Sequence, residues 1–215
     1  MLNNSYPGLF AAVEGLDGSG KSSQVSAVAR HLSKTGKNAF ITFEPSGSAV
    51  GNLIRACLLG ERQSSPLALQ LLFAADRAQH LDKEIIPRLK KGDCVITDRY
   101  AFSSFAYGAV ENDLDWLIDI NSRFLEPDLV IYMEASPEAC IERIKTKRTS
   151  VELFEKTSIL KEVARNYEVV FKRKEFKKIS FVNVDSGLGI DINAVQISTL
   201  IDNMITKKAA QTAAK

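Results

Sequence analysis

The sequence predicts an α/β fold: a three-layer sandwich in which a five-stranded parallel sheet carries helices on both faces. Short apolar runs alternate with helical patterns along all 215 residues, which is typical of parallel strands joined by crossover helices. Hydrophobic residues make up 45% of the chain, enough for a full core without disulfide bonds. No internal repeat or Pro/Gly-rich linker interrupts the pattern, so we expect a single domain over residues 1–215.

The individual elements follow from the same signals. The apolar runs predict strands at 9–13, 39–43, 94–97, 129–133 and 179–184. Helical patterns lie between them, at about 21–34, 49–59, 67–91, 103–124, 136–145, 154–172 and 193–207. Gly36 and Gly92 end helices, Gly108 interrupts one, and Ser136 followed by Pro137 begins another.

The charge balance excludes some classes of function. There are 28 basic and 26 acidic residues, for a net charge of +2, which gives no signal for binding nucleic acid or another polyanion. No stretch approaches a membrane span, and no signal peptide precedes the first strand. The three cysteines are scattered and form no CxxC pair. We therefore expect a cytoplasmic protein with buried, reduced cysteines and no membrane partner.

A phosphate-binding motif follows the first predicted strand. Residues 15–22, Gly-Leu-Asp-Gly-Ser-Gly-Lys-Ser, match GxxxxGK[ST] in full, between a strand and a helix as the chemistry requires. Its backbone N–H groups and the helix N-terminus hold phosphates, Lys21 reaches the β- and γ-phosphates, and Ser22 is a ligand for Mg²⁺. The motif predicts a P-loop NTPase fold that binds a nucleoside triphosphate with Mg²⁺, without separating a kinase from a GTPase or another ATPase. The residues expected to bind the nucleotide are Gly15, Leu16, Asp17, Gly18, Ser19, Gly20, Lys21, Ser22 and Ser23.

Other strand ends predict a second phosphate site. Ligands on such sheets sit at the carboxyl edge, where Glu44, Asp98 and Arg99 come directly after strands. Asp98 can hold the metal or its water shell, and the Arg99 guanidinium can hold phosphate oxygens. Two phosphate sites side by side suit phosphoryl transfer between two nucleotides. On the helix between, Phe73 and Arg77 share one face, as an aromatic plane and a guanidinium suited to a base.

Five strings of residues together resemble thymidylate kinase, in order and at its usual spacing. They are VEGLDGSGKSSQ (13–24), FEP (43–45), LLFAADR (71–77), TDRYAFSSFAYG (97–108) and PDLVIYMEASPE (127–138). The resemblance covers nearly the whole chain. It implies a kinase that transfers the γ-phosphoryl of ATP to thymidine monophosphate (dTMP), for dTTP synthesis, and that forms a homodimer.

The resemblance also implies roles for individual residues, with a monophosphate-binding region at about 44–80. Asp17 meets the deoxyribose 3′-hydroxyl, Glu44 lies near the metal and sugar, and Arg99 holds the acceptor phosphate. The residues implied to read the base and sugar are Phe73, Arg77, Ser103, Ser104 and Tyr107.

Some positions depart from the family pattern. Phe43 stands where many bacterial members have arginine, and Phe105 and Gly108 stand where glutamine is common. The basic stretch at about 143–156 resembles the lid of these kinases, which closes over ATP and carries an arginine when the phosphate loop has none. Since this phosphate loop has no arginine, the resemblance implies that the lid provides the cation. Arg148 is the first candidate, with Arg143 and Lys147 behind it.

The implied reaction needs no general base, because the acceptor phosphate is already a nucleophile. Lys21, Arg99, Mg²⁺ and a lid arginine then neutralise the charge that spreads during transfer. Two other interpretations remain open. A deoxynucleoside kinase would use a carboxylate at the end of the second strand as its base, a place that Glu44 occupies. A regulatory protein would bind nucleotide without turnover.

Overall fold

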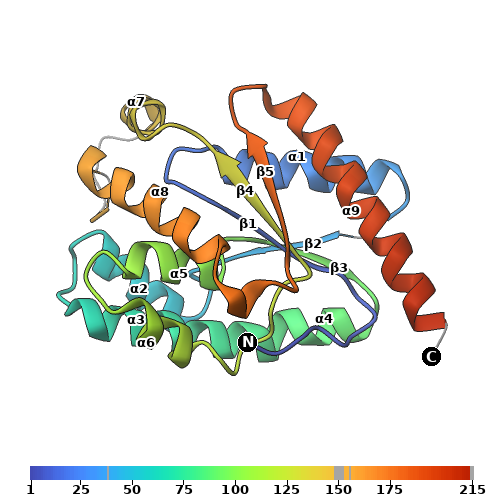
Figure 1. Ribbon diagram of the computed structural model, residues 1–215, viewed down its shortest axis with the longest axis horizontal. Helices are drawn as coiled ribbons and strands as arrows, with labels where there is room; N and C mark the ends of the chain where they lie inside the picture. Colours follow the sequence, from blue (N-terminus) through green and yellow to red (C-terminus); the bar gives the residue numbers. More distant parts are fainter. Residues whose placement is uncertain (38, 148–152, 155, 214–215) are drawn as a thin grey trace.

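The computed structural model describes residues 1–37, 39–147, 153–154 and 156–213. Five parallel strands form one sheet in the order β2-β3-β1-β4-β5, which confirms the predicted fold class (Figure 1). Their bounds lie within two residues of those expected: β1 (Phe10–Gly15), β2 (Ala39–Phe43), β3 (Cys94–Asp98), β4 (Leu129–Glu134) and β5 (Ser180–Asp185).

Helices α1 (Lys21–Lys34) and α9 (Ile190–Ala213) lie together on one face of the sheet (Figure 1). Their apolar positions, among them Val25, Leu32 and Ile197, are buried against strand residues such as Val13 and Ile131. Helix α1 has the expected bounds, and α9 extends beyond the expected 193–207 at both ends. This face therefore anchors the helix that begins at Lys21, directly after the phosphate loop.

The predicted helix 67–91 is three segments in the structure: α3 (Pro66–His80), a π-helical turn (Leu81–Ile85) and α4 (Ile86–Lys90). Pro87 explains the change, since it has no N–H for the i−4 carbonyl and its ring crowds that carbonyl. A wider, π-helical turn accommodates the proline: the N–H of Ile86 donates to the carbonyl of Leu81, five residues earlier, in place of the usual four. Apart from this proline, no local pattern in the sequence indicates the π-turn.

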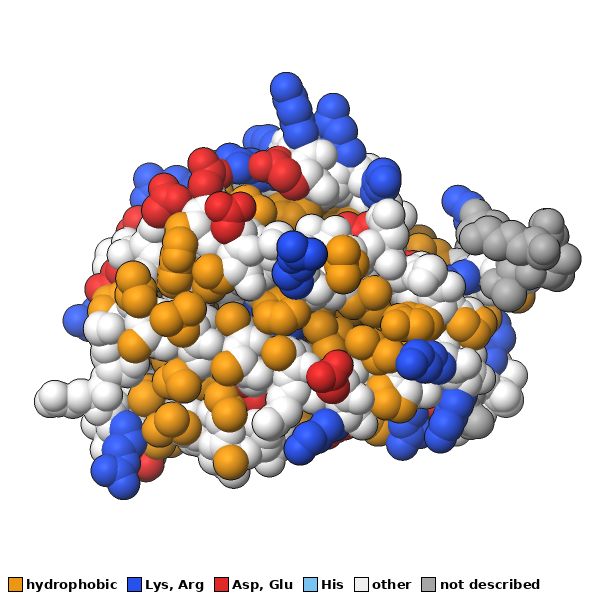
Figure 2. Space-filling view, turned by 90° about the horizontal axis from the view of Figure 1, so that it is seen from below, with side chains coloured by type: hydrophobic (Ala, Val, Ile, Leu, Met, Phe, Trp, Pro, Cys, Tyr) orange, Lys and Arg blue, Asp and Glu red, His pale blue; other side chains and the backbone are white. Residues whose placement is uncertain are grey.

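The predicted interruption near Gly108 is confirmed, because α5 (Ala101–Gly108) ends there and α6 (Leu114–Ile120) follows. The other helices are α2 (Ala49–Leu58), α7 (Pro137–Lys147) and α8 (Thr157–Phe171), and a 3-10 turn, Lys174–Phe176, was not expected. Figure 2 shows many apolar side chains on the face that carries α3, α4 and α6. Within the described residues, no helix combines the length and apolarity needed to span a membrane.

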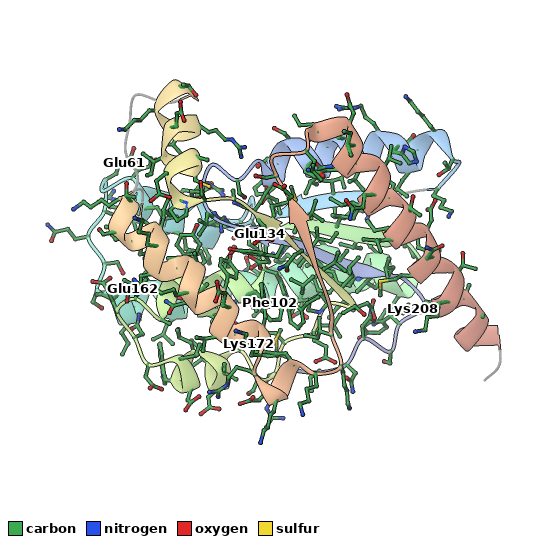
Figure 3. The ribbon with its side chains drawn as sticks, turned by 45° about the horizontal axis from the view of Figure 1, so that its top comes forward. Glu61, Phe102, Glu134, Glu162, Lys172 and Lys208 are labelled. Atoms are coloured by element: carbon green, nitrogen blue, oxygen red, sulfur yellow. The ribbon has the colours of Figure 1, made fainter. Side chains whose placement is uncertain are left out.

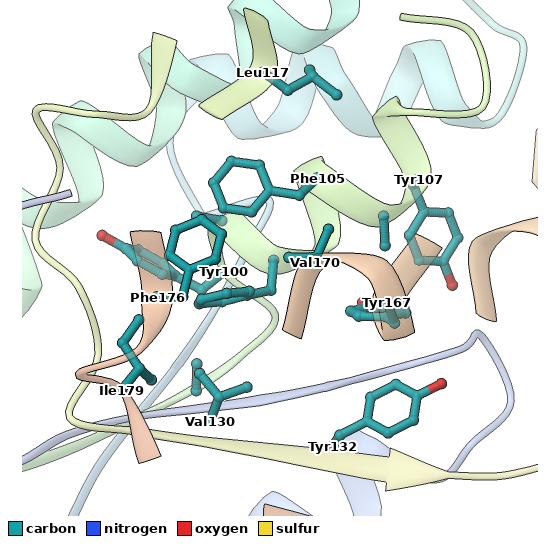
Figure 4. Close-up of a cluster of buried hydrophobic side chains, with 14 of the residues drawn as sticks. Tyr100, Phe105, Tyr107, Leu117, Val130, Tyr132, Tyr167, Val170, Phe176 and Ile179 are labelled. Carbon is teal, nitrogen blue, oxygen red and sulfur yellow. The ribbon is translucent and has the colours of Figure 1, made fainter. Parts of the chain in front are cut away.

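An aromatic core fills the space between the other face of the sheet and helices α5 and α8. Phe102 lies inside this core (Figure 3). Glu162 lies on the exposed side of α8, and Lys172 is exposed directly after the end of that helix. The rings of Phe105 and Phe176 stack at a centroid distance of 5.4 Å (Figure 4). Phe105 is therefore a core residue. The packing holds α5 rigidly beside the site described next.

Candidate active site

The carboxyl ends of β2, β3 and β1 are neighbours in the sheet, and a pocket of about 490 Å³ opens there. Asp98 pairs in register with Val13 on one side and Phe43 on the other. The pocket is lined by residues from the phosphate loop, β2, α3, α5 and the predicted lid, among them Lys21, Glu44, Phe73, Arg77, Arg99, Ser104, Tyr107 and Arg143. The structure thus brings together most of the residues that the sequence singled out.

The phosphate loop is a tight backbone turn between β1 and α1. Gly18 has φ of +81° and lies so close to α7 that an added Cβ would come 2.4 Å from the carbonyl oxygen of Cys140, so only glycine fits there. Gly20, Ser22 and Ser23 line the pocket, whereas the Leu16 side chain is buried in the core. The open end of this loop and the N-terminus of α1 form an anion-binding site.

Lys21 is the buried cation of the phosphate loop. Its Nζ donates a hydrogen bond of 2.7 Å to the carbonyl oxygen of Leu16. Burial, followed by the positive charge of Arg99, lowers the pKa of Lys21 to about 8, although Asp17 and other carboxylates act in the opposite direction. A bound triphosphate would restore the charged form, because an anion nearby stabilises the ammonium group.

This lowered pKa predicts pH-dependent ATP affinity. Free Lys21 loses its proton as pH rises through about 8, while bound phosphates keep it protonated, so affinity should fall with rising pH and binding near pH 8 should take up protons. Calorimetry between pH 7 and 9.5, in two buffers of different ionisation enthalpy, measures both effects. Lys21→Arg, charged throughout this range, should show no uptake. Equal affinity of the wild type at every pH would contradict the prediction.

Ser22 and Asp98 offer oxygen ligands suited to a hard cation. The Ser22 hydroxyl donates a 2.5 Å hydrogen bond to Asp98 Oδ2, and both residues line the pocket. Mg²⁺ commonly takes one or two protein oxygens and completes its shell with water and phosphate. The described residues hold no cluster of three or more His, Cys, Asp or Glu that suits a metal. The oxygen atoms of Ser22 and Asp98 are of the kind that suits Mg²⁺ bound together with a nucleotide.

Arg99 is held at the centre of the pocket by contacts on all sides. Its backbone adopts φ of +70°, unusual for a side-chain-bearing residue. Its guanidinium donates to Gly15 O at 3.2 Å and Ser103 Oγ at 2.8 Å, forms an ion pair with Asp17, and lies 4.9 Å from the centre of the Tyr107 ring. This arrangement aims a fixed, planar cation at the phosphate loop.

Asp17 lies beside both cations of the pocket. Burial opposes its ionisation, but the positive charges of Arg99 and Lys21 outweigh burial and lower the pKa of Asp17. Its backbone N–H donates to the Tyr107 hydroxyl at 2.9 Å. Asp17 is therefore an ionised hydrogen-bond acceptor in the lining of the pocket.

The buried carboxylate of Glu14 holds the backbone that follows Arg99 in place. This role of Glu14 was not expected from the sequence. It is fully buried, and burial raises its pKa against the opposing hydrogen bonds. It accepts hydrogen bonds from Tyr100 N at 2.8 Å, Ser103 Oγ at 2.6 Å and Tyr167 OH at 2.9 Å. These bonds fix the turn around Arg99. The sequence signal that could have predicted this role is a carboxylate at the end of an apolar strand, directly before the glycine-rich loop.

Arg77 lies in a buried polar network that the sequence only partly predicted. Its Nε and Nη2 donate to Glu44 Oε2 at 3.0 and 2.7 Å, and other N–H groups reach Asn121 Oδ1 and Ser104 Oγ. Glu44 Oε1 lies 3.2 Å from Nδ1 of His80. The structure thus places Glu44 against Arg77, whereas the expectation put it near metal and sugar. His80 is also buried in this network.

Phe73 and Arg55 complete the same side of the pocket. Phe73 is half-buried on α3, packs against a small cluster around Ile54 and Leu69, and lines the cavity. Arg55 on α2 was not expected; it donates to the carbonyl oxygens of Pro45 and Ser46 at 2.7 and 2.8 Å. No motif marks Arg55, which reaches the pocket only because α2 folds back over the Glu44-Pro45 turn.

Three described residues of the predicted lid, Arg143, Ile144 and Phe154, line the pocket. Arg143 Nη1 donates to Gly18 O at 3.4 Å and to Ser186 Oγ at 3.1 Å. The Phe154 ring lies 5.5 Å from that of Tyr107, and Leu153 N donates to Leu58 O on α2. Helix α7 runs to Lys147, further than expected. Arg148, the first candidate for the lid cation, lies outside the described residues.

Comparison with known proteins adds independent information. A family model described as thymidylate kinase matches residues 13–185. The chain is 37% identical over 190 residues to a probable thymidylate kinase of Thermococcus gammatolerans, covering 84% of this chain and 90% of that protein. It is 36% identical over 197 residues to a probable thymidylate kinase of Caldivirga maquilingensis, covering 91% and 94%.

Proposed function

This chain belongs to the thymidylate kinase family, and we propose that it transfers the γ-phosphoryl group of ATP to dTMP, giving dTDP and ADP on the way to dTTP. The chain is accordingly an ATP-dependent nucleoside monophosphate kinase. The observation that carries the proposal is that Arg99 shares one pocket with Lys21 and contacts the phosphate loop through Gly15 and Asp17. Two cationic phosphate sites in one cavity suit transfer between two phosphates.

In this proposal, residues 15–23 bind ATP and Arg99 binds the acceptor phosphate. Binding of dTMP draws Arg99 away from Asp17, whose carboxylate then accepts a hydrogen bond from the 3′-hydroxyl of the deoxyribose. Ser22 and Asp98 would hold Mg²⁺. The ion supplies charge neutralisation on the β- and γ-phosphates when it is bound. Lys21 and Arg99 contribute the protein's own positive charge at the transferring group.

We further propose that residues 44–80 form the monophosphate-binding region. Phe73 stacks on the thymine ring, Arg77 donates to a base carbonyl, and Ser103, Ser104 and Tyr107 border the base and sugar. The buried ion pair between Arg77 and Glu44 supports a binding role, because a guanidinium held in one orientation reads an acceptor atom at a defined place. Glu44 then acts by orienting Arg77.

A lid at about 143–156 closes over ATP in this proposal and excludes water, which would otherwise compete as acceptor. Arg148 remains the first candidate for its catalytic cation, on sequence grounds alone. The contacts of Arg143 with Gly18 and Ser186 make Arg143 the second candidate. Phe154 supports closure over this side of the pocket, since it already contacts Tyr107.

The geometry favours this reaction over the two rivals. A deoxynucleoside kinase needs a free carboxylate base near the 5′-hydroxyl, but both oxygens of Glu44 face Arg77 or His80. A regulatory protein without turnover has no need of the full set of Lys21, Asp98 and Arg99 around one cavity. We therefore rank both rivals below the monophosphate kinase.

We propose a homodimer in the cytoplasm. Apolar side chains exposed on α3, Leu67 at 52% and Leu71 at 47%, together with Leu53 on α2 at 43%, support an interface along these helices. Three free, buried cysteines agree with a reducing compartment. Sedimentation would show a molecular mass near twice 23.7 kDa if the dimer forms.

The proposal is tested by product analysis after incubation with ATP, Mg²⁺ and dTMP. Chromatography should show dTDP and ADP appearing in equal amounts. ADP that appears with inorganic phosphate, and without dTDP, would mean that water is the acceptor and would reject the proposal.

A further inference from the structure

Gln70 presents an unused carboxamide in the pocket. The residue lies on α3, is 3% exposed and lines the cavity. Its Oε1 is buried and accepts no hydrogen bond, and its amide nitrogen donates none within the described part of the chain. Buried polar groups almost always have partners in folded proteins. An unpaired carboxamide at a binding cavity therefore indicates a partner that the ligand supplies.

Gly108 fixes where this carboxamide lies. A Cβ added at Gly108 would come within 2.9 Å of Gln70 Cδ and 3.0 Å of Gln70 Oε1. The side chain of Gln70 thus packs directly on the α5 backbone, in space that any larger residue at position 108 would occupy. This contact explains the glycine at 108 and holds the carboxamide at one end of the pocket.

Gln70 shares its helix face with the other pocket residues of α3. Gln70, Phe73 and Arg77 are spaced i, i+3 and i+7, which places them along one side of the helix. On α5, Ser104 and Gly108 are one turn apart. Arg77 donates to Ser104 at 3.1 Å while Gln70 meets Gly108. An amide, an aromatic ring and a guanidinium therefore line one wall of the cavity.

Among the described residues, one N–H of Arg77 has no hydrogen-bond partner and is available to a ligand. Nε and Nη2 donate to Glu44 and Ser104, and one N–H of Nη1 donates to Asn121. The Asn121 amide is itself fixed by a 2.8 Å hydrogen bond to Leu117 O. A guanidinium donates only, so the ligand atom that meets the remaining N–H of Nη1 must be an acceptor.

We propose that Gln70 is a base-reading residue. Its carboxamide turns when nucleotide binds, so that Oε1 leaves the Gly108 backbone and accepts the N3–H of thymine next to the carbonyl that Arg77 contacts. The inference rests on the proposed function and deepens it. Thymine and uracil offer a carbonyl beside an N–H, which matches the donor of Arg77 and the acceptor of Gln70. Cytosine offers an amino group at the carbonyl position, where it would meet the donor of Arg77. Gln70 by itself does not discriminate thymine from cytosine, because its amide can rotate to present either the Oε1 acceptor or the Nε2 donor.

The test compares binding of dTMP with binding of its N3-methyl analogue, which lacks the N–H. Dissociation constants from calorimetry are measured for the wild type, for Gln70→Ala, and for Gln79→Ala, the same change at an exposed position of α3. The wild type and Gln79→Ala should bind dTMP at least about 30-fold more tightly than the analogue. Gln70→Ala removes the acceptor and opens space, so its preference should fall to within about threefold while dTMP itself binds about tenfold more weakly.

Each outcome decides one question. A wild type that does not bind dTMP would reject the proposed function itself. A wild type that binds dTMP but tolerates the methyl group, or a Gln70→Ala variant that keeps the full preference, would overturn the role of Gln70. If Gln70→Ala does not fold, Gly108→Ala provides the same test, because its Cβ displaces the carboxamide and should likewise reduce the preference.

Discussion

Replacing Lys21 with methionine is expected to lower phosphoryl transfer at least about 10³-fold, since a charge that stabilises the transferring group is lost from a buried site. Lys21 is 6% exposed, and burial disfavours its charged form in the folded protein. An apolar side chain of similar length removes that cost, so thermal stability should be equal or higher at pH 7.

The measurement for this prediction is a single-turnover rate of dTDP formation, with a thermal unfolding curve for each protein. Lys34→Met is the matched control, because Lys34 lies at the exposed end of the same helix and should leave the rate unchanged. A Lys21→Met enzyme within tenfold of the wild-type rate would show that the phosphate role of Lys21 is wrong.

Replacing Arg99 with lysine is expected to reduce kcat/KM for dTMP about 100-fold or more, while ATP affinity changes by less than about threefold. Arg99 contacts Gly15, Ser103 and Asp17 through two nitrogens of a planar group. A lysine ammonium is a point charge that cannot hold this geometry or bind two phosphate oxygens in parallel. The substitution should therefore weaken the use of the acceptor dTMP and leave the binding of ATP almost unchanged.

Steady-state kinetics with varied dTMP, and calorimetry with ATP, measure these two effects separately. Arg88→Lys is the control. Arg88 lies on α4, its guanidinium carbon is 4.2 Å from the centre of the Phe40 ring, and it does not line the pocket. Unchanged kcat/KM in Arg99→Lys would remove Arg99 from the acceptor site, and an equal loss of ATP affinity would place it with the donor.

The sequence predicted the features that depend on local signals. The alternation of apolar runs and helical patterns was enough for the sheet, and the motif at 15–22 was enough for the turn before α1. Glu44, Asp98 and Arg99 come together in space because parallel strands end at one edge, a property of the fold class alone. This is why a correct fold class already located the pocket.

The supporting contacts were not predictable from the sequence, because they join residues far apart in the chain. Tyr167 reaches Glu14 from α8, and Asn121 reaches Arg77 from the end of α6. The helix face of Phe73 and Arg77 was foreseen, yet Gln70 on the same face was missed, since nothing in the sequence tells that its amide lacks a partner. The roles of the site residues themselves remain predictions.

The most direct test of the central claim is a coupled assay of ADP release with ATP and Mg²⁺, in which each nucleoside monophosphate and thymidine itself are offered as acceptors in parallel. The account predicts turnover that is strongest with dTMP and weak with dCMP, dAMP and dGMP. Turnover with thymidine but not with dTMP would contradict it and would assign the protein to the nucleoside kinases, with Glu44 as the base. Silence with every acceptor, in a folded protein that still binds ATP, would contradict it in favour of a regulatory role.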